Sequence, residues 1–397
     1  MENEPPYTDV AQTQEQSKTP IRMILAIFSA LFGIGMASQN FAPILIGALQ
    51  QRWGLSVATA GLVQSSELLA IALASLGLAS VVTTTSPRTF ALIGCVVAGS
   101  SYLLTCIVHG VLGLVLLRVT AGIGAAMCIC AANFVLAQQR EPDRLYAIGV
   151  ALASIAYFVF YPPIVYAASQ TQGWGAYATE GAWVLALMPF VALLPRKVHV
   201  DTPGPDTAVR GRLSPKLLFF TLPILLYGIF STGSWSFSGT IATALGIGPV
   251  SYGYALSAGT ALGILSASVA SALGTKYGRT RPVACGLFIG AIAALAFFTT
   301  RVPSVFFISF LATQTLYNFN LPFMLGQCSA MDSSGRLATA AMSALMIASA
   351  TAPALAGWAI ERVGTPFLGW STVIAYALSF LIFYLSEIRS SRRQEYS

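Results

Sequence analysis

Two charged residues stand inside long apolar runs, where a charge is costly and therefore informative. Arg118 lies in the run 111–137, and Glu67 lies in the run 57–81. In a membrane, each charge would cost about 2.5–3.5 kcal/mol at the bilayer centre unless an opposite charge offset it. Counted from the same end of the two runs, Arg118 is about 10 Å deep and Glu67 about 15 Å deep, at 1.5 Å per residue. These depths are compatible with an ion pair or a water-bridged pair.

Such a pair of side chains allows two interpretations. In the first, it is a proton and charge site: Glu67 binds and releases a proton, while Arg118 tunes that carboxyl or holds an anionic substrate. In the second, it is a static pair that locks two helices together, or Arg118 extends toward the membrane surface.

Other residue patterns that carry chemistry are missing from the sequence. The two histidines, His109 and His199, are far apart, and none of the six cysteines forms a CxxC pair. No phosphate-binding glycine loop and no nucleophile elbow occurs. We therefore expect no enzyme activity, no metal and no cofactor.

The composition indicates an integral membrane protein. Only 9% of the 397 residues are charged and 56% are hydrophobic, whereas a soluble protein carries roughly a quarter charged residues. A membrane helix needs about 20 mostly apolar residues. That rule predicts twelve spans, at 22–46, 57–81, 89–109, 111–136, 146–169, 178–195, 216–243, 250–273, 282–300, 304–326, 337–359 and 366–386.

The basic residues predict the orientation of these spans. With the N-terminus in the cytosol, 17 of the 21 lysines and arginines fall in cytosolic segments and three in outer loops, and Arg118 alone is inside a span. This is the distribution that the positive-inside rule expects. Both termini are therefore predicted to be cytosolic, and the net charge of +7 reflects topology.

The chain also repeats itself at an offset of 192 residues. The segment 143–163 resembles 335–355, since both carry Arg-Leu at their second and third positions and proline 17 to 19 residues after the arginine. The same offset places the first three spans on the seventh, eighth and ninth. We predict an all-α membrane protein of two parallel six-helix repeats, which would rock around a central site. The predicted parts are a tail (1–21), a bundle (22–195), a linker (196–215), a bundle (216–388) and a tail (389–397).

Two motifs carry a resemblance to a known family. RVTAGIGAA, which begins at Arg118, fits the form RxxxGxGxA in the fourth span. SALGTKYGRTR, residues 271–281, is similar to a loop motif of the form GxxxD(R/K)xGRR, with threonine in place of the aspartate. On these motifs the chain resembles the major facilitator superfamily of secondary transporters, of the bacterial type, along essentially its whole length. The glycine–proline motif that many antiporters of the family carry in helix 5 is absent.

The resemblance implies a central cavity lined by helices 1, 4, 7 and 10. Polar and aromatic residues that recur on one face of these helices, or near Glu67 and on helix 5, are then candidates for substrate binding. These are Gln39, Asn40, Gln64, Tyr157, Tyr161, Tyr227, Ser231, Ser234, Trp235, Gln314, Tyr317 and Asn318. The loop motif implies a gating role for Lys276, Gly278, Arg279 and, in the first half, Arg88.

Together these features predict a transporter in the cell (inner or plasma) membrane. It would move a small organic solute, an organic anion or a neutral aromatic-bearing molecule, by alternating access and proton-coupled symport, with the proton gradient as energy source. A proton-driven efflux antiporter for drugs or sugars is the first alternative, and a solute sensor that does not transport is the second. The expected partners are a small-molecule substrate and the lipid bilayer, with no nucleic acid, and the protein is expected to act as a monomer.

Overall fold

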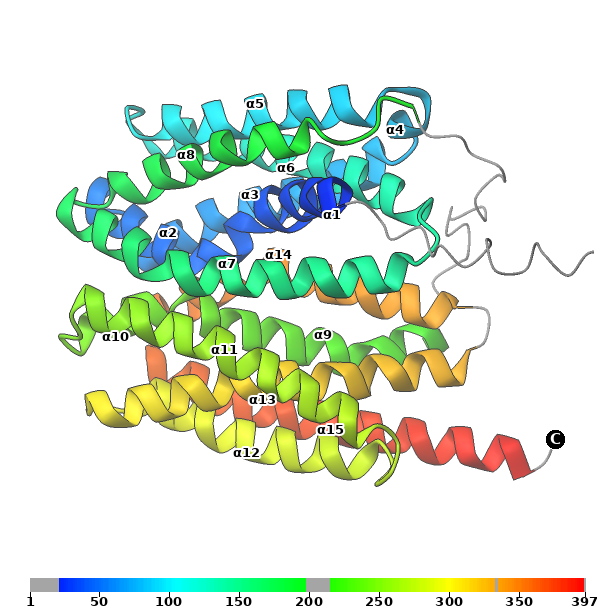
Figure 1. Cartoon of the computed structure of the whole chain (residues 1–397). Helices are drawn as coiled ribbons and strands as arrows, with labels where there is room; N and C mark the ends of the chain where they lie inside the picture. Colours follow the sequence, from blue (N-terminus) through cyan, green and yellow to red (C-terminus); the bar gives the residue numbers. More distant parts are fainter. Residues whose placement is uncertain (1–20, 198–214, 333–334, 396–397) are drawn as a thin grey trace, which may run out of the picture.

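The computed structural model describes residues 21–197, 215–332 and 335–395, and within these ranges helices and short turns form the whole structure (Figure 1). The elements of the first half are α1 (Ile21–Ile27), the π-helix η1 (Phe28–Gly35), α2 (Ala37–Trp53), α3 (Val57–Leu78), α4 (Val81–Thr84), α5 (Pro87–Thr105), α6 (Val111–Ala137), α7 (Pro142–Gln170) and α8 (Trp174–Val191). Those of the second half are α9 (Pro215–Ser236), α10 (Ser238–Ala244), α11 (Pro249–Leu273), α12 (Thr280–Thr299), α13 (Pro303–Met331), α14 (Arg336–Arg362) and α15 (Thr365–Glu395).

The helix starts follow from local sequence. The Ser56 side chain accepts a hydrogen bond from the Thr59 amide and caps α3, and Ser86 caps α5 in the same way ahead of Pro87. Proline also opens α7, α11 and α13. Proline suits the first helical position because its missing N–H would have no partner there and its φ angle is already helical.

Every predicted span coincides with a helix or with consecutive helical segments. Nine helical stretches of the described residues are long and apolar enough to cross a membrane, while α8, α9 and α13 do not meet both criteria. The number of crossings and the orientation of the termini therefore stay predictions. Large apolar side chains such as Leu76, Ile107 and Phe288 are exposed at 79%, 71% and 69%, as expected where lipid replaces water.

The structure corrects three boundaries of the sequence prediction. The first span continues past residue 46 to Trp53 and contains a π-helical stretch. The span 216–243 is broken at Phe237, whose φ and ψ of −102° and 9° interrupt the helix. The tail predicted from residue 389 begins as a continuation of α15. The tail before residue 21 and most of the predicted linker lie outside the described residues, so those limits of the two bundles stay predictions.

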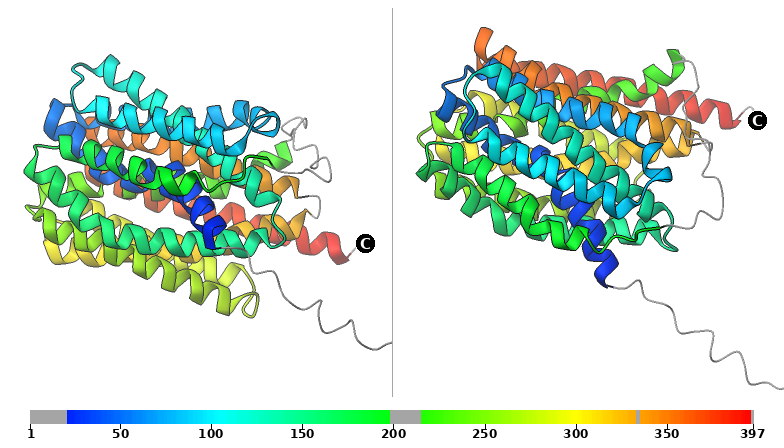
Figure 2. Two further views of the ribbon diagram at one scale, coloured as in Figure 1. Left: turned by 45° about the horizontal axis from the view of Figure 1, so that its top comes forward. Right: turned by 90° about the horizontal axis from the view of Figure 1, so that it is seen from above.

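The helix starts confirm the internal repeat. Helices α3 and α11 begin at Val57 and Pro249, and helices α6 and α13 begin at Val111 and Pro303, so both pairs are 192 residues apart. In Figure 1, α1 to α8 fill the upper part of the molecule, and α9, α11, α12, α13 and α15 fill the lower part. Helices α3 and α14, and α7 and α11, join the two groups. The long helices keep similar directions in both views of Figure 2.

Two glycines of the motif that begins at Arg118 let neighbouring helices approach α6. A Cβ atom at Gly122 would lie 2.5 Å from the Glu67 carbonyl oxygen on α3. A Cβ atom at Gly124 would lie 2.6 Å from the Gly94 oxygen and the Ala98 nitrogen on α5. Backbone atoms cannot rotate away as a side chain can, so only glycine fits at these positions. Small residues at such crossings are the usual means of close packing in membranes.

Gly124→Ala should therefore lower the melting temperature of the purified protein, because α5 and α6 must separate. Overpacking of this kind costs about 1–3 kcal/mol. Gly47→Ala is the matched control: Gly47 is also inside a helix, but an added Cβ there meets no atom within 4 Å. Alanine favours a helix over glycine, so Gly47→Ala should melt at or above the wild-type temperature. Equal melting of the two variants would contradict this packing argument.

Candidate functional site

A cavity of about 960 Å³ lies between the two groups of helices. Its volume is at the upper end of the range typical of small-molecule sites. No aspartate, glutamate, lysine, arginine or histidine is among the described residues that line it. The predicted substrate residues that do line it are Gln39, Asn40, Tyr157, Tyr161, Ser231, Trp235, Gln314, Tyr317 and Asn318.

Three predicted substrate residues lie outside this lining. Gln64 is buried and donates to the Ser38 hydroxyl at 2.9 Å. Tyr227 is buried within the second half and donates to the Leu316 carbonyl at 3.0 Å. Ser234 donates to the Phe230 carbonyl of its own helix at 2.8 Å. These donor groups are thus engaged inside the protein, although the buried Gln64 Oε1 atom has no hydrogen-bond partner among the described residues.

An aromatic wall forms one side of the cavity. Tyr157 and Tyr161 stack at 5.9 Å, and the ring of Tyr161 meets Trp235 edge-on at 6.1 Å. Trp235 in turn stacks on the buried Phe310 at 6.1 Å. The polar ends of this wall are fixed by backbone carbonyls: Tyr157 donates to Phe32, Tyr161 to Asn40 and Trp235 to Gln39. The rings are therefore held in place before any solute arrives.

Hydrogen bonds between the two halves close the cavity at one end. The Ala58 amide donates to Glu361 at 2.7 Å, the Ala354 amide to Ser65 at 2.9 Å, and Gln50 to Thr240 at 2.9 Å. The lining reaches Tyr146 near the start of α7 and Ala272 near the end of α11. Those residues belong to the opposite end of the bundle, where α15 ends, so the cavity extends toward that end.

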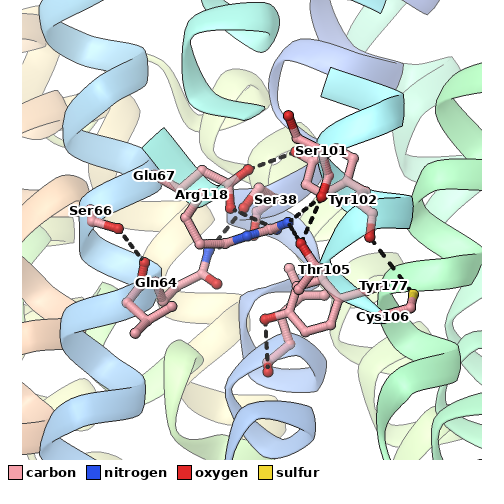
Figure 3. A network of polar contacts seen from close by, with 12 residues as sticks. Ser38, Gln64, Ser66, Glu67, Ser101, Tyr102, Thr105, Cys106, Arg118 and Tyr177 are labelled. Carbon is pink, nitrogen blue, oxygen red and sulfur yellow. Dashed lines mark hydrogen bonds and ion pairs between the residues drawn. The ribbon is translucent and has the colours of Figure 1, made fainter. Parts of the chain in front are cut away.

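Glu67 and Arg118 form a fully buried ion pair in the first half, outside the cavity lining (Figure 3). An Arg118 Nη atom lies 3.3 Å from one Glu67 oxygen, and the Tyr102 hydroxyl donates to the other at 2.6 Å. Arg118 also donates to the Thr105 hydroxyl at 2.5 Å and to the Ser101 carbonyl at 3.5 Å. Its guanidinium lies over the rings of Tyr102 and Tyr177, at 4.7 and 4.6 Å. Residues of α3, α5, α6 and α8 thus enclose one cation.

Sequence reasoning missed a third buried charge-bearing residue, Glu180 of α8. Its side chain is 1% exposed, and it interacts electrostatically with Glu67 and Arg118. The predicted span 178–195 placed this glutamate at a membrane surface, where a carboxylate is ordinary. Because α8 begins at Trp174, Glu180 is nearly two turns inside the helix. The signal that could have found it was an acidic residue followed by a long apolar run.

The predicted gating residues lie at the turns between helices. Lys276 and Gly278 are in the turn between α11 and α12, and Gly278 has a φ of +71° that favours glycine. The Arg279 side chain reaches toward Gly326 of α13. Arg88 lies in the first turn of α5. Their role in gating stays a prediction.

The family model of the Major Facilitator Superfamily matches residues 27–326. The chain belongs to this superfamily. No curated protein sequence matches the chain.

Solved structures of the superfamily share the fold. The nucleoside transporter NupG has a TM-score of 0.67 at 14% identity, over 93% of this chain and 99% of that one. A D-xylose–proton symporter has a TM-score of 0.69 at 14% identity, over 92% and 96%. A bacterial homologue of the human lysosomal transporter Spinster, inward-facing and occupied, has a TM-score of 0.68 at 14% identity, over 92% and 96%. The chain is thus a multi-pass membrane protein with a transporter fold.

The two variants Glu67→Gln and Arg118→Gln, with their double variant, should show strong coupling in thermal unfolding. Arg118→Gln leaves a buried carboxylate without its cation, which costs about 3–5 kcal/mol. The double variant should be more stable than Arg118→Gln alone, with a coupling energy of about 0.5–3 kcal/mol. Arg144→Gln, which removes the exposed pair with Glu141, should leave the melting temperature unchanged. Additive effects of the two single variants would show that the pair does not interact.

Proposed function

We propose that this superfamily member is a secondary transporter of a small, neutral, aromatic-bearing organic solute in the cell (inner or plasma) membrane. The observation that carries the proposal is the uncharged, aromatic and amide-lined cavity between the two helix groups. Solute would enter at the extended end of the cavity and leave after the groups rock to close that end and open the other. Proton-coupled symport with cytosolic termini is part of the same proposal.

The position of Arg118 supports a neutral solute over the organic anion that the sequence also allowed. An organic anion would need a cation that faces the substrate, and the sequence offered Arg118 for that role. Its guanidinium is instead fully buried against Glu67, Thr105 and two tyrosine rings. An anion in the cavity would meet aromatic rings and amides without a cation, and would lose its hydration with little return. A neutral solute avoids that cost.

A counterflow screen in proteoliposomes tests this function. Proteoliposomes that contain the purified full chain would be loaded with unlabelled nucleosides, pentoses, benzoate or no solute. Entry of the same compound in labelled form would then be measured. Nucleosides and xylose are chosen because two solved structures of the same fold are named as transporters of these compounds. We expect exchange of a neutral compound and none of benzoate. Exchange of benzoate alone would overturn the proposed class, and binding without exchange would favour a sensor.

Trp235→Ala should reduce counterflow of the solute at least tenfold, because it removes the ring that joins Tyr161 to Phe310. The matched control is Ser234→Ala on the same helix turn, whose hydroxyl bonds only to its own helix and lies outside the cavity lining. That variant should transport at the wild-type rate. Wild-type counterflow by Trp235→Ala, with correct folding in detergent, would contradict a role of the aromatic wall.

A further inference from the structure

Glu67, Arg118 and Glu180 form a buried charge cluster. Among the described residues, no group donates a hydrogen bond to the Glu180 carboxyl. Neither of its oxygens has a hydrogen-bond partner there. Tyr102 interacts with Glu180, but Tyr102 donates its single hydroxyl proton to Glu67 at 2.6 Å. Glu67 in contrast is held at both oxygens, by Tyr102 and by Arg118. The partners of Glu67 therefore stabilise a carboxylate, whereas Glu180 has no such stabilisation.

The groups that surround Glu180 contain one cation. Helices α5, α7, η1, α2 and α1 pack against α8, and the cluster also includes residues of α3 and α6. Arg52 and Arg22 lie at the last turn of α2 and the start of α1, and η1 contains no titratable residue. Among the described residues, the titratable and charged groups that interact electrostatically with Glu180 are Glu67, Tyr102, Arg118, Tyr157 and Tyr177.

Charge balance then requires one proton in this cluster. Arg118 keeps its charge in proteins and neutralises one carboxylate, so a second carboxylate would leave a net negative charge in a sealed, fully buried site. Such a charge is costly, and a buried carboxyl takes up a proton instead. Glu67 has the donors that a carboxylate needs, whereas Glu180 has none.

We propose that Glu180 is the residue that binds and releases the coupled proton, while the neighbouring Glu67–Arg118 ion pair keeps both of its charges. This inference rests on the proton coupling in the proposed function. On uptake, a hydronium ion gives its proton to the Glu180 carboxylate and leaves water. On release, the carboxylic acid returns that proton to water on the other side and becomes a carboxylate. Only the protonated cluster is neutral, so the sealed state through which the halves rock requires the proton.

One face of α8 links this carboxyl to the cavity. Trp183, one turn from Glu180, donates to the Gly33 carbonyl of η1 at 2.6 Å. A Cβ atom at Gly33 would lie 2.5 Å from the Leu187 side chain, which follows on the same face of α8. The neighbouring Phe32 carbonyl accepts from Tyr157, and both Phe32 and Tyr157 line the cavity. A shift of α8 on proton release would therefore move η1 behind the solute. A π-helical stretch is a frequent feature of functional sites.

Thermal unfolding of Glu180→Gln and Glu67→Gln tests the assignment without any solute. Glutamine resembles a protonated glutamate, so Glu180→Gln should melt at or above the wild-type temperature. Glu67→Gln removes the carboxylate beside Arg118 and should melt lower. Glu141→Gln, at an exposed ion pair, is the matched control and should melt as wild type. If Glu67→Gln is the tolerated change and Glu180→Gln the harmful one, the roles are reversed and the proposal is wrong.

Infrared spectroscopy of the purified protein at neutral pH gives an independent readout of the proton. We expect a protonated-carboxyl C=O band in the wild type, unchanged in Glu141→Gln and lost in Glu180→Gln. Absence of the band in the wild type, or its persistence in Glu180→Gln, would overturn the proposal.

Transport separates this inference from the proposed function. With the solute found by counterflow, Glu180→Gln should retain exchange but lose accumulation driven by a pH gradient. Gradient-driven accumulation at the wild-type level in Glu180→Gln would overturn the role of Glu180 and leave the solute transporter intact. If no solute exchanges in the wild type, the proposed function fails, and the melting and infrared results still decide where the proton resides.

Discussion

A fully buried arginine constrains the first half of this protein more than any other group. Its guanidinium is removed from water, and acceptors and aromatic faces around it offset much of that cost. Glu67 comes from α3, Thr105 and Tyr102 from α5, and Tyr177 from α8. Four helices are therefore tied to one point, and the backbone contact at Gly122 lets α3 approach closely enough. The first half is thus held together at this point.

The second repeat fills the same positions with different chemistry. At the offset of 192 residues, Phe310 corresponds to Arg118 and Gly259 to Glu67. Phe310 is fully buried and stacks on Trp235, while Gly259 lines the cavity and lies close to Gln314. This half has no charge pair at these two positions, and the ring of Phe310 supports Trp235 there instead. The duplicated fold therefore carries a charge cluster on one side and an aromatic wall on the other.

The sequence predicted what periodicity and charge can encode. Apolar runs located the helices, and a charge in such a run identified Glu67 and Arg118. Their direct contact needed the structure, because depth along two helices does not say which faces meet. The same limit explains why the predicted substrate residues Gln64 and Tyr227 lie outside the cavity lining. Each shares a helix face with other predicted site residues, but its polar group points into its own half. Glu180 was missed because the predicted start of its span was four residues later than α8 begins. The helix break at Phe237 was missed because position 237 itself is neither glycine nor proline.

The hydrogen bonds that close the cavity differ from the contacts around Arg118 in how easily water can replace them. Across the interface, the backbone amides of Ala58 and Ala354 donate to Glu361 and Ser65. The Ala58 amide lies in the first turn of α3, where it has no intrahelical acceptor, and the Ala354 amide directly follows Pro353 inside α14. They lose little when the interface opens, because water at the mouth can replace the side-chain oxygen. The partners of Arg118 have no such substitute, since no water reaches a fully buried guanidinium. Separation of the halves at this end, with the charge cluster intact, would therefore cost less free energy than separation of the helices around Arg118.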